Sequence, residues 1–221
     1  MVRSEHLSVD SRQLADLGRL VALGEGQRLE FKRKASFPDK IVRELIAFAN
    51  CNGGTLLVGV DDDGTIAGVK YPEEEWMAIE KEVSARCRPR LEVAYQLIRL
   101  NEKKCVVRVD VDRSDHRPHF ITEGSRRISF VREKDQSIKA SREMVEIIRR
   151  MKTMDGMKFH YGDAEQKIIR YLADHPVISL REFSRLSGLG RFAASRRLVR
   201  LVLANVLRIT PTEKGDVFSR V

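Results

Sequence analysis

Arginines gather in one stretch near the end of the chain, where acidic residues are missing. No Asp or Glu lies between Phe183 and Thr212, and that stretch contains six arginines: Arg185, Arg191, Arg196, Arg197, Arg200 and Arg208. Arg196 and Arg200 are four residues apart and therefore share one face of a helix, with Arg197 beside them. A helix face with one sign of charge is typical of a helix that reads a groove or holds phosphates. The pattern predicts that nucleic acid is contacted by Arg191, Arg196, Arg197 and Arg200.

Two other roles stay open for this basic helix. It could be a solvated basic face without a ligand, or it could belong to a domain that makes protein contacts. Base reading and phosphate contact are both open for these arginines as well, because both use the same side chain.

The elements around the arginines form a small helical domain over residues 162–221. Apolar spacing predicts a helix over 163–174, a second helix opened by the capping box of Ser179 and Glu182, and a third helix over 191–205. A glycine-containing turn separates the second helix from the third, and a short hairpin follows. Three helices with such a turn and a terminal hairpin resemble a winged helix-turn-helix.

A second patterned stretch runs from Leu29 to Val69 and reads as strand, helix, strand, turn and strand. In the first strand Leu29 and Phe31 point one way and the charged residues beside them point the other, which predicts a half-buried strand with a charged face. An almost wholly apolar strand over 55–60 then leads to three acids, Asp61 to Asp63. The charged strand face and the acidic strand end could lie side by side in one sheet.

The order of short motifs in this region carries a resemblance to a known family. The motifs are Glu25, Glu30-Phe31-Lys32, Ala47-Phe48-Ala49-Asn50, Gly53-Gly54, and Gly59-Val60 followed by Asp61 to Asp63. Together they resemble the Schlafen AlbA_2 domain, also called the divergent AAA-4 family, over roughly residues 12–150. The resemblance implies a mixed α/β fold, with a mixed sheet and flanking helices. Glu133 stands where the family usually has a glycine, which weakens any nucleotide-binding role at that edge.

The resemblance also implies a catalytic site. In eukaryotic Schlafen nucleases, the positions of Glu25, Glu30 and Asp62 form a three-carboxylate site that cuts structured RNA with a divalent metal. Three carboxylates within a few Å repel strongly unless a cation neutralises them, and oxygen ligands suit Mg²⁺ or Mn²⁺. These three residues are therefore the candidate catalytic and metal-binding residues. The candidates for holding the phosphate backbone beside them are Lys32, Arg33 and Lys34.

Each of these acids also has an ordinary structural explanation. The run from Asp61 to Gly64 is typical of an exposed hairpin turn, Glu30 could pair with Lys32 or Arg33, and Glu25 could lie in solvent. An ATPase has little support, because the chain contains no G-x-x-x-x-G-K-[ST] motif to cradle phosphates.

Composition favours two domains and an acidic partner. The 221 residues include 41 Lys and Arg against 32 Asp and Glu, a net charge of +9. Residues 158–221 hold twelve basic and six acidic residues, so most of the excess charge belongs to the last third. We expect domains over 11–151 and 162–221 joined by a linker over 152–161. No apolar run approaches the roughly 20 residues that span a bilayer, so a cytoplasmic protein without a membrane segment is expected.

These patterns together predict a two-domain nucleic-acid-binding protein. The resemblance favours a divalent-metal-dependent endoribonuclease acting on structured RNA such as tRNA. The alternative is a non-enzymatic transcriptional regulator, in which the winged helix binds DNA and the first domain senses a ligand or dimerises. Eukaryotic Schlafen cores join two AlbA_2 lobes in one chain, whereas this chain has one, so a homodimer is expected.

Overall fold

The chain forms two compact units, Met1–Ser137 (unit 1) and Ile138–Val221 (unit 2). The computed structural model describes residues 9–151 and 161–221, and almost all of the predicted linker over 152–161 lies outside them. Seven helices occur among the described residues. None of these helices is both long enough and apolar enough to cross a membrane.

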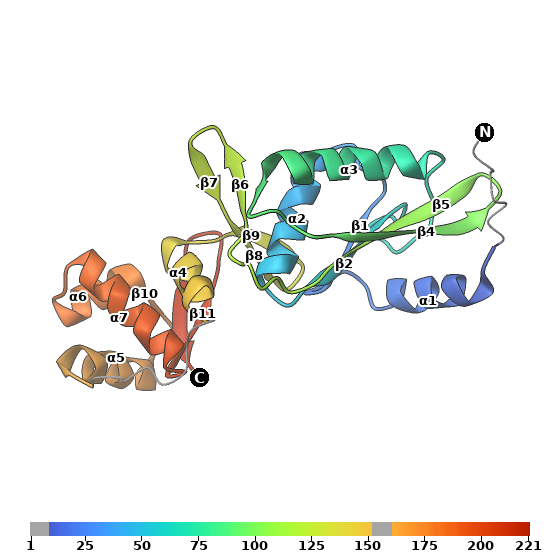
Figure 1. Cartoon of the computed structure of the whole chain (residues 1–221). Coiled ribbons are helices and arrows are strands. Elements are labelled where there is room, and N and C mark those ends of the chain that lie inside the picture. The colour runs from blue at the N-terminus through green and yellow to red at the C-terminus, as the bar shows by residue number, and fades with distance from the viewer. Residues whose placement is uncertain (1–8, 152–160) are drawn as a thin grey trace. The chain divides into compact units, whose positions relative to one another are not determined.

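A four-stranded mixed sheet forms the centre of unit 1 (Figure 1). Across the sheet its strands are β1 (Leu29–Lys32), β2 (Gly54–Val58), β5 (Lys104–Val111) and β4 (Ala94–Asn101). β1 and β2 run parallel and are joined by α2 (Pro38–Asn50), whereas the other two pairs are antiparallel. The expectation that the charged strand lies beside the strand leading to the acids is confirmed.

Helices cover both faces of this sheet, as Figure 1 shows. α2 and α3 (Pro72–Arg86) pack with Leu56 and Val58 on one face, and α1 (Ser11–Val21) packs with Phe31 and Leu57 on the other. Side chains alternate along a strand, so Glu30 lies on the face opposite Phe31, under α2. The prediction of a half-buried β1 is wrong for this reason: Glu30 is only 6% exposed.

Two smaller sheets complete unit 1. β3 (Cys87–Arg88), β6 (Phe120–Glu123) and β7 (Arg126–Ile128) form one, and β8 (Phe130–Glu133) pairs with β9 (Gln136–Lys139) in the other. The boundary between the two units falls within β9. None of the strands between residues 120 and 139 joins the central sheet.

The turn between α2 and β2 requires glycine at two positions. Gly53 has a φ of +72°, and a Cβ atom there would lie 2.7 Å from the carbonyl oxygen of Val111. A Cβ atom on Gly54 would lie 2.5 Å from the ring of Phe48. Only glycine tolerates both the left-handed backbone and these approaches, so the paired glycines allow β2 to begin directly beneath α2.

Unit 2 combines helices with a small antiparallel sheet of order β10-β12-β11. The capping box predicted at Ser179 and Glu182 is present, and Gly188 ends the second of the three expected helices with a φ of +74°. Phe183, Leu198 and Phe218 are fully buried in the core of the unit. The elements are α4 (Arg142–Arg150), α5 (Asp163–Asp174), β10 (Ile178–Ser179), α6 (Leu180–Ser187), α7 (Arg191–Leu203), β11 (Leu207–Thr210) and β12 (Val217–Arg220).

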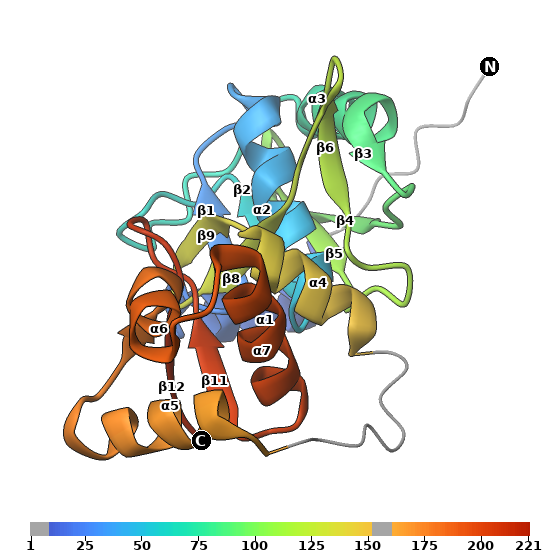
Figure 2. The ribbon, with the colours of Figure 1, turned by 90° about the vertical axis from the view of Figure 1, so that its left-hand side faces the viewer.

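α4 belongs to unit 2, whereas the sequence analysis assigned this helix to the first domain. Ile147 of α4 packs against Val199 and Leu203 of α7. Figures 1 and 2 both show the two helices side by side. The apolar spacing of α4 indicates which of its sides is buried but not which helix covers that side.

A buried ion pair joins α5 to α7. Glu165 is 1% exposed, and it accepts hydrogen bonds from Arg197 Nη1 at 2.6 Å and from the backbone N–H of Gly162 at 3.0 Å. Burial by itself would raise the pKa of Glu165, but the hydrogen bonds from Arg197 and the backbone outweigh it. The pKa therefore lies below its usual value of 4.5.

We expect unit 2 to lose stability as the pH falls below about 4.5. Because the pKa of Glu165 is lower in the folded chain, its carboxylate takes up a proton more readily when the chain is unfolded. The stabilisation is complete above the unfolded-state pKa and is lost as the pH falls through the folded-state pKa. Urea unfolding at a series of pH values should show Glu165→Gln to be less stable at neutral pH and less sensitive to acid. Asp174→Asn is the control, because Asp174 is exposed and forms no ion pair among the described residues. Equal acid sensitivity of Glu165→Gln and wild type would contradict the assignment.

Candidate functional site

The three predicted carboxylates come from separate segments of unit 1. Glu25 precedes β1, Glu30 is within β1, and Asp62 lies in the turn that follows β2. Burial raises the pKa of Glu25, and the negative charges of Glu30 and Asp62 raise it further, against a hydrogen bond from the Phe31 N–H. The charges of Glu30 and Asp62 therefore both act on Glu25.

Glu30 is held by two cations. Lys32 Nζ pairs with its Oε1 atom, and Arg132 Nη2 lies 2.6 Å from its Oε2 atom. One of the structural explanations considered for Glu30, pairing with Lys32, is thus present. The second partner is an arginine from β8, about a hundred residues away in the chain.

Arg132 is the centre of a buried charge network. Its side chain is fully buried and donates hydrogen bonds to the carbonyl oxygens of Gly26 and Leu29, at 2.9 and 3.3 Å for Nη2. Nη1 lies 2.6 Å from a carboxylate oxygen of Glu44 on α2. The guanidinium thus ties β8 to β1, to the loop before β1 and to α2.

Glu44 is the second acid of this network. Burial raises its pKa, and so does the nearby charge of Glu30, whereas Ser137, which donates a hydrogen bond to it, and Arg132 lower it. Removing a charged group from water is unfavourable unless hydrogen bonds or opposite charges replace the lost hydration. Glu44 therefore depends on Arg132 and Ser137 to remain charged inside the domain.

The three basic residues after Glu30 differ in their availability. Lys32 is partly buried and is engaged by Glu30 and by the Phe31 carbonyl oxygen. Arg33 is 72% exposed, and its Nη1 atom lies 3.3 Å from Asp61. Lys34 is exposed. Arg33 and Lys34 are therefore the members of the predicted set that can reach a ligand from solution.

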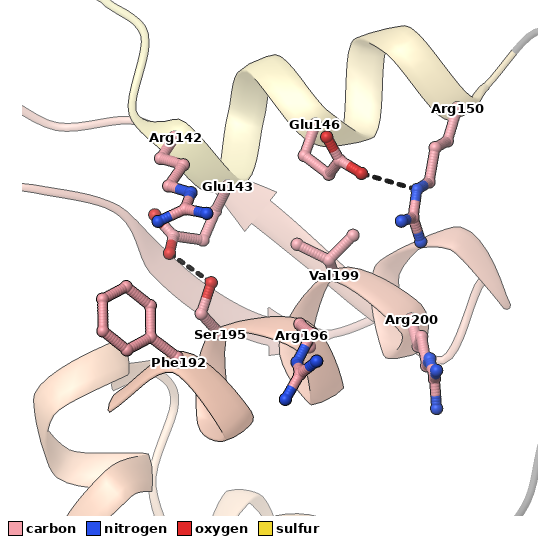
Figure 3. Close-up of a pocket in the computed structure, with 9 residues that line it drawn as sticks. All are labelled: Arg142, Glu143, Glu146, Arg150, Phe192, Ser195, Arg196, Val199 and Arg200. Atoms are coloured by element: carbon pink, nitrogen blue, oxygen red, sulfur yellow. Dashed lines mark hydrogen bonds and ion pairs between the residues drawn. The ribbon is translucent and has the colours of Figure 1, made fainter. Parts of the chain in front are cut away.

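The predicted arginines of unit 2 lie on α7 but not in equivalent environments. Arg191, Arg196 and Arg200 are exposed, whereas Arg197 is engaged by the buried Glu165. Figure 3 shows Arg196 and Arg200 projecting from the same side of α7. Neither forms an ion pair among the described residues. Arg197 thus has a structural partner, and Arg196 and Arg200 keep free guanidinium groups.

Comparison with known proteins assigns unit 1. The family model described as Schlafen, AlbA_2 matches residues 25–141, more than half of the chain. The chain belongs to the Schlafen AlbA_2 family. No curated protein is significantly similar to it.

Two solved structures are similar to parts of this AlbA_2 protein. The DIP2311 protein of Corynebacterium diphtheriae is 19% identical, with a TM-score of 0.43, and the match covers 66% of this chain but only 28% of that protein. An N-terminal domain from Nitrosomonas europaea, titled as that of a putative ATP-dependent DNA helicase RecG-related protein, is 22% identical with a TM-score of 0.44. That match covers 67% of this chain and 97% of that domain.

The carboxylates of the AlbA_2 domain do not fit a metal ion in this arrangement. Among the described residues, no group of three or more His, Cys, Asp or Glu side chains is placed to hold one. Both oxygens of Glu30 face cationic partners, and Glu25 Oε1 accepts the N–H of Phe31 at 2.8 Å. A carboxylate whose two oxygens are already paired with cations is a poor metal ligand.

The sequence analysis missed two central residues of this site, Arg132 and Glu44. Arg132 ends the sequence Phe130-Val131-Arg132, and nothing in this run indicates which acid pairs with the arginine. Glu44 lies on α2 beside the buried residues Leu45 and Ile46, and an acid next to this apolar run was the available signal. Neither spacing nor charge indicates that the two residues meet, because they are 88 residues apart.

We expect Arg132→Met to destabilise the AlbA_2 domain by about 3–5 kcal/mol, because the buried Glu30 and the partly buried Glu44 would lose their shared cation. Urea unfolding of the full chain measures this effect. Arg132→Lys should restore only part of the stability, since one ammonium group cannot reproduce the fork of guanidinium donors.

The matched control is Arg126→Ala, which removes an exposed arginine from β7. The triple variant Glu30→Gln, Glu44→Gln, Arg132→Met should be more stable than Arg132→Met alone, because it leaves no buried charge. A loss below about 1 kcal/mol for Arg132→Met, the level of an exposed ion pair, would contradict the central role of this guanidinium.

Proposed function

We propose that this protein binds nucleic acid through the arginines of α7, without itself cleaving it. The observation that carries the proposal is the pair of exposed guanidinium groups of Arg196 and Arg200, which have no acidic partner among the described residues (Figure 3). Unpaired cations fixed on one side of a rigid helix suit a repeating array of phosphates. Arg191, exposed at the start of α7, adds a third positive charge.

The order of elements in unit 2 supports a winged helix-turn-helix. α5, β10, α6 and α7 are followed by the β11–β12 hairpin, and the short β10 strand pairs with β12. In such domains the last helix is the one that contacts nucleic acid. That helix is α7, on which Arg196 and Arg200 lie.

The AlbA_2 domain contributes scaffold and further positive charge in this proposal. Its Glu30 and Glu44 both form ion pairs with Arg132, which supports a structural role for these two acids. Arg33 and Lys34 are exposed beside the turn that carries Asp61, and they can contact additional phosphates. The protein then acts as a regulator of the nucleic acid that it binds.

We expect the affinity for nucleic acid to fall as salt rises, with a log–log slope of about −0.9 per duplex phosphate contact and about −0.7 for a single strand. Replacing Arg196 and Arg200 together by Ala should remove one or two phosphate contacts and make that slope less steep by the corresponding amount. Titration of fluorescently labelled DNA and RNA across a salt series provides the measurement. Arg170→Ala is the matched control, because Arg170 is an exposed arginine on α5. A slope unchanged by the double substitution would remove α7 from the interface.

A second candidate is the endoribonuclease that the family resemblance implies. The observation that favours it is the electrostatic coupling of Glu25 with Glu30 and Asp62, because acids in one neighbourhood are typical of a catalytic site. Glu30 is already paired with two cations, which supports a structural role for this acid and therefore the non-catalytic binding function.

Incubation of the full chain with tRNA and Mn²⁺ separates the two candidates. Asp62→Asn is the decisive variant, since Asp62 is exposed, and Glu30→Gln serves only if its fold is intact. We expect wild type and Asp62→Asn to leave the same amount of intact tRNA. Cleavage by the wild type that Asp62→Asn abolishes would establish the endoribonuclease and overturn the non-catalytic assignment.

A further inference from the structure

α7 is covered on two opposite sides. At 3.6 residues per turn, Ala194, Leu198 and Leu201 fall on one side of the helix, where they are fully buried in the core of unit 2. Val199 and Leu203 fall on nearly the opposite side, yet they are only 4% and 6% exposed. The second side is buried because α4 lies along it.

α4 is held in place by contacts with α7 and with the loop before β12. Ile147 packs on the apolar side chains of α7, and Ser195 on α7 donates a hydrogen bond to Glu143. Ser141, the N-cap of α4, also donates a hydrogen bond to Asp216 in the loop before β12. These contacts make α4 a fixed part of the surface that α7 presents.

A covered α7 does not suit the major groove. The groove of B-DNA is about 12 Å wide and admits one helix. A single helix with its side chains is already about 10–12 Å across, and packed helices lie about 8–10 Å apart. A recognition helix normally inserts the side that faces away from the core of its domain, and on α7 that side is covered by α4. The two helices together are too broad to enter the major groove.

What α7 leaves open beside α4 is a cleft of about 400 Å³. Phe192 is 70% exposed at this cleft, and the Arg142 guanidinium lies 5.5 Å from the centre of its ring. Figure 3 shows Phe192, Arg196 and Arg200 in succession along α7, with Arg142 above the aromatic ring. The volume is within the usual range for a small-molecule site, large enough for one nucleotide.

The acids of the cleft do not cancel its positive charge. Four arginines and two glutamates line it: Arg142, Arg150, Arg196, Arg200, Glu143 and Glu146. Glu146 is paired with Arg149 and Arg150, and Glu143 accepts the hydroxyl of Ser195. Four arginines against two glutamates leave a net charge of +2. Arg196 and Arg200 form no ion pair among the described residues, so both can bind an anion. An exposed aromatic ring beside free cations is the combination that binds single strands.

We propose that the cleft between α4 and α7 binds single-stranded nucleic acid in preference to duplex. One unpaired base stacks on Phe192, and the neighbouring phosphates pair with Arg196 and Arg200. A single strand can present its bases and phosphates to the edge of α7 that α4 leaves open, whereas a duplex keeps its bases stacked inside. The inference rests on the proposed nucleic-acid-binding function and names the form of the substrate.

The test compares one sequence as a single strand and as a duplex, about 16 nucleotides long and free of self-complementarity. Fluorescence anisotropy with the full chain should give at least about tenfold tighter binding of the single strand, and Phe192→Leu should weaken it about tenfold. Phe192→Tyr should retain the affinity, because tyrosine preserves the stacking surface. Equal thermal unfolding of the two variants checks that the fold is intact, as expected for a side chain so exposed.

The outcomes separate this inference from the proposed function. Duplex binding that equals or exceeds single-strand binding, and that is lost with Arg196→Ala and Arg200→Ala, would leave the proposed function standing and overturn the single-strand preference. Equal affinities of Phe192→Leu and wild type for the single strand would also overturn it, because stacking would play no part. Binding to neither form would overturn the proposed function itself.

Discussion

The buried guanidinium of Arg132 is the interaction on which the AlbA_2 domain depends. It reaches β1, the loop before β1 and α2 from β8, so four segments share one cation. Removing such charges from water costs several kcal/mol per ion unless each has partners. The network meets that requirement through two carboxylates and two backbone carbonyl oxygens. The positions of β1 and α2 are consequently coupled to the correct placement of a strand much later in the chain.

The same network limits the chemistry available to the carboxylates. Glu30 is stable in the interior because it pairs with Arg132 and Lys32. These ion pairs leave neither of its oxygens free to bind a metal ion. Glu25 lies near enough to Glu30 and Asp62 for their charges to raise its pKa, whereas both oxygens of Glu30 face side-chain cations. An acid motif of the family can thus persist in sequence while its charges serve the fold.

In unit 2 the governing constraint is the burial of α7 from two sides. A helix with apolar residues on opposite sides must be sandwiched, and α4 supplies the second layer. Phe192, Arg196 and Arg200 line the cleft that stays open between the two helices. Electrostatics then favours phosphate contact, while the shape of the α4–α7 pair favours a flexible strand over a rigid duplex.

Local patterns in the sequence were enough to predict most helices and strands and the location of the positive charge. Alternation and helical spacing indicated β1, α2 and the helices of unit 2, because these signals depend on neighbouring residues. The sequence also predicted the capping box at Ser179, which is a contact across three residues. Three features became visible in the tertiary structure alone. Glu30 is buried in an ion pair with Arg132, and Arg197 forms an ion pair with Glu165. α4 packs along α7. Each of these depends on partners far apart in the chain, and residue types alone do not show which charges or apolar faces will meet.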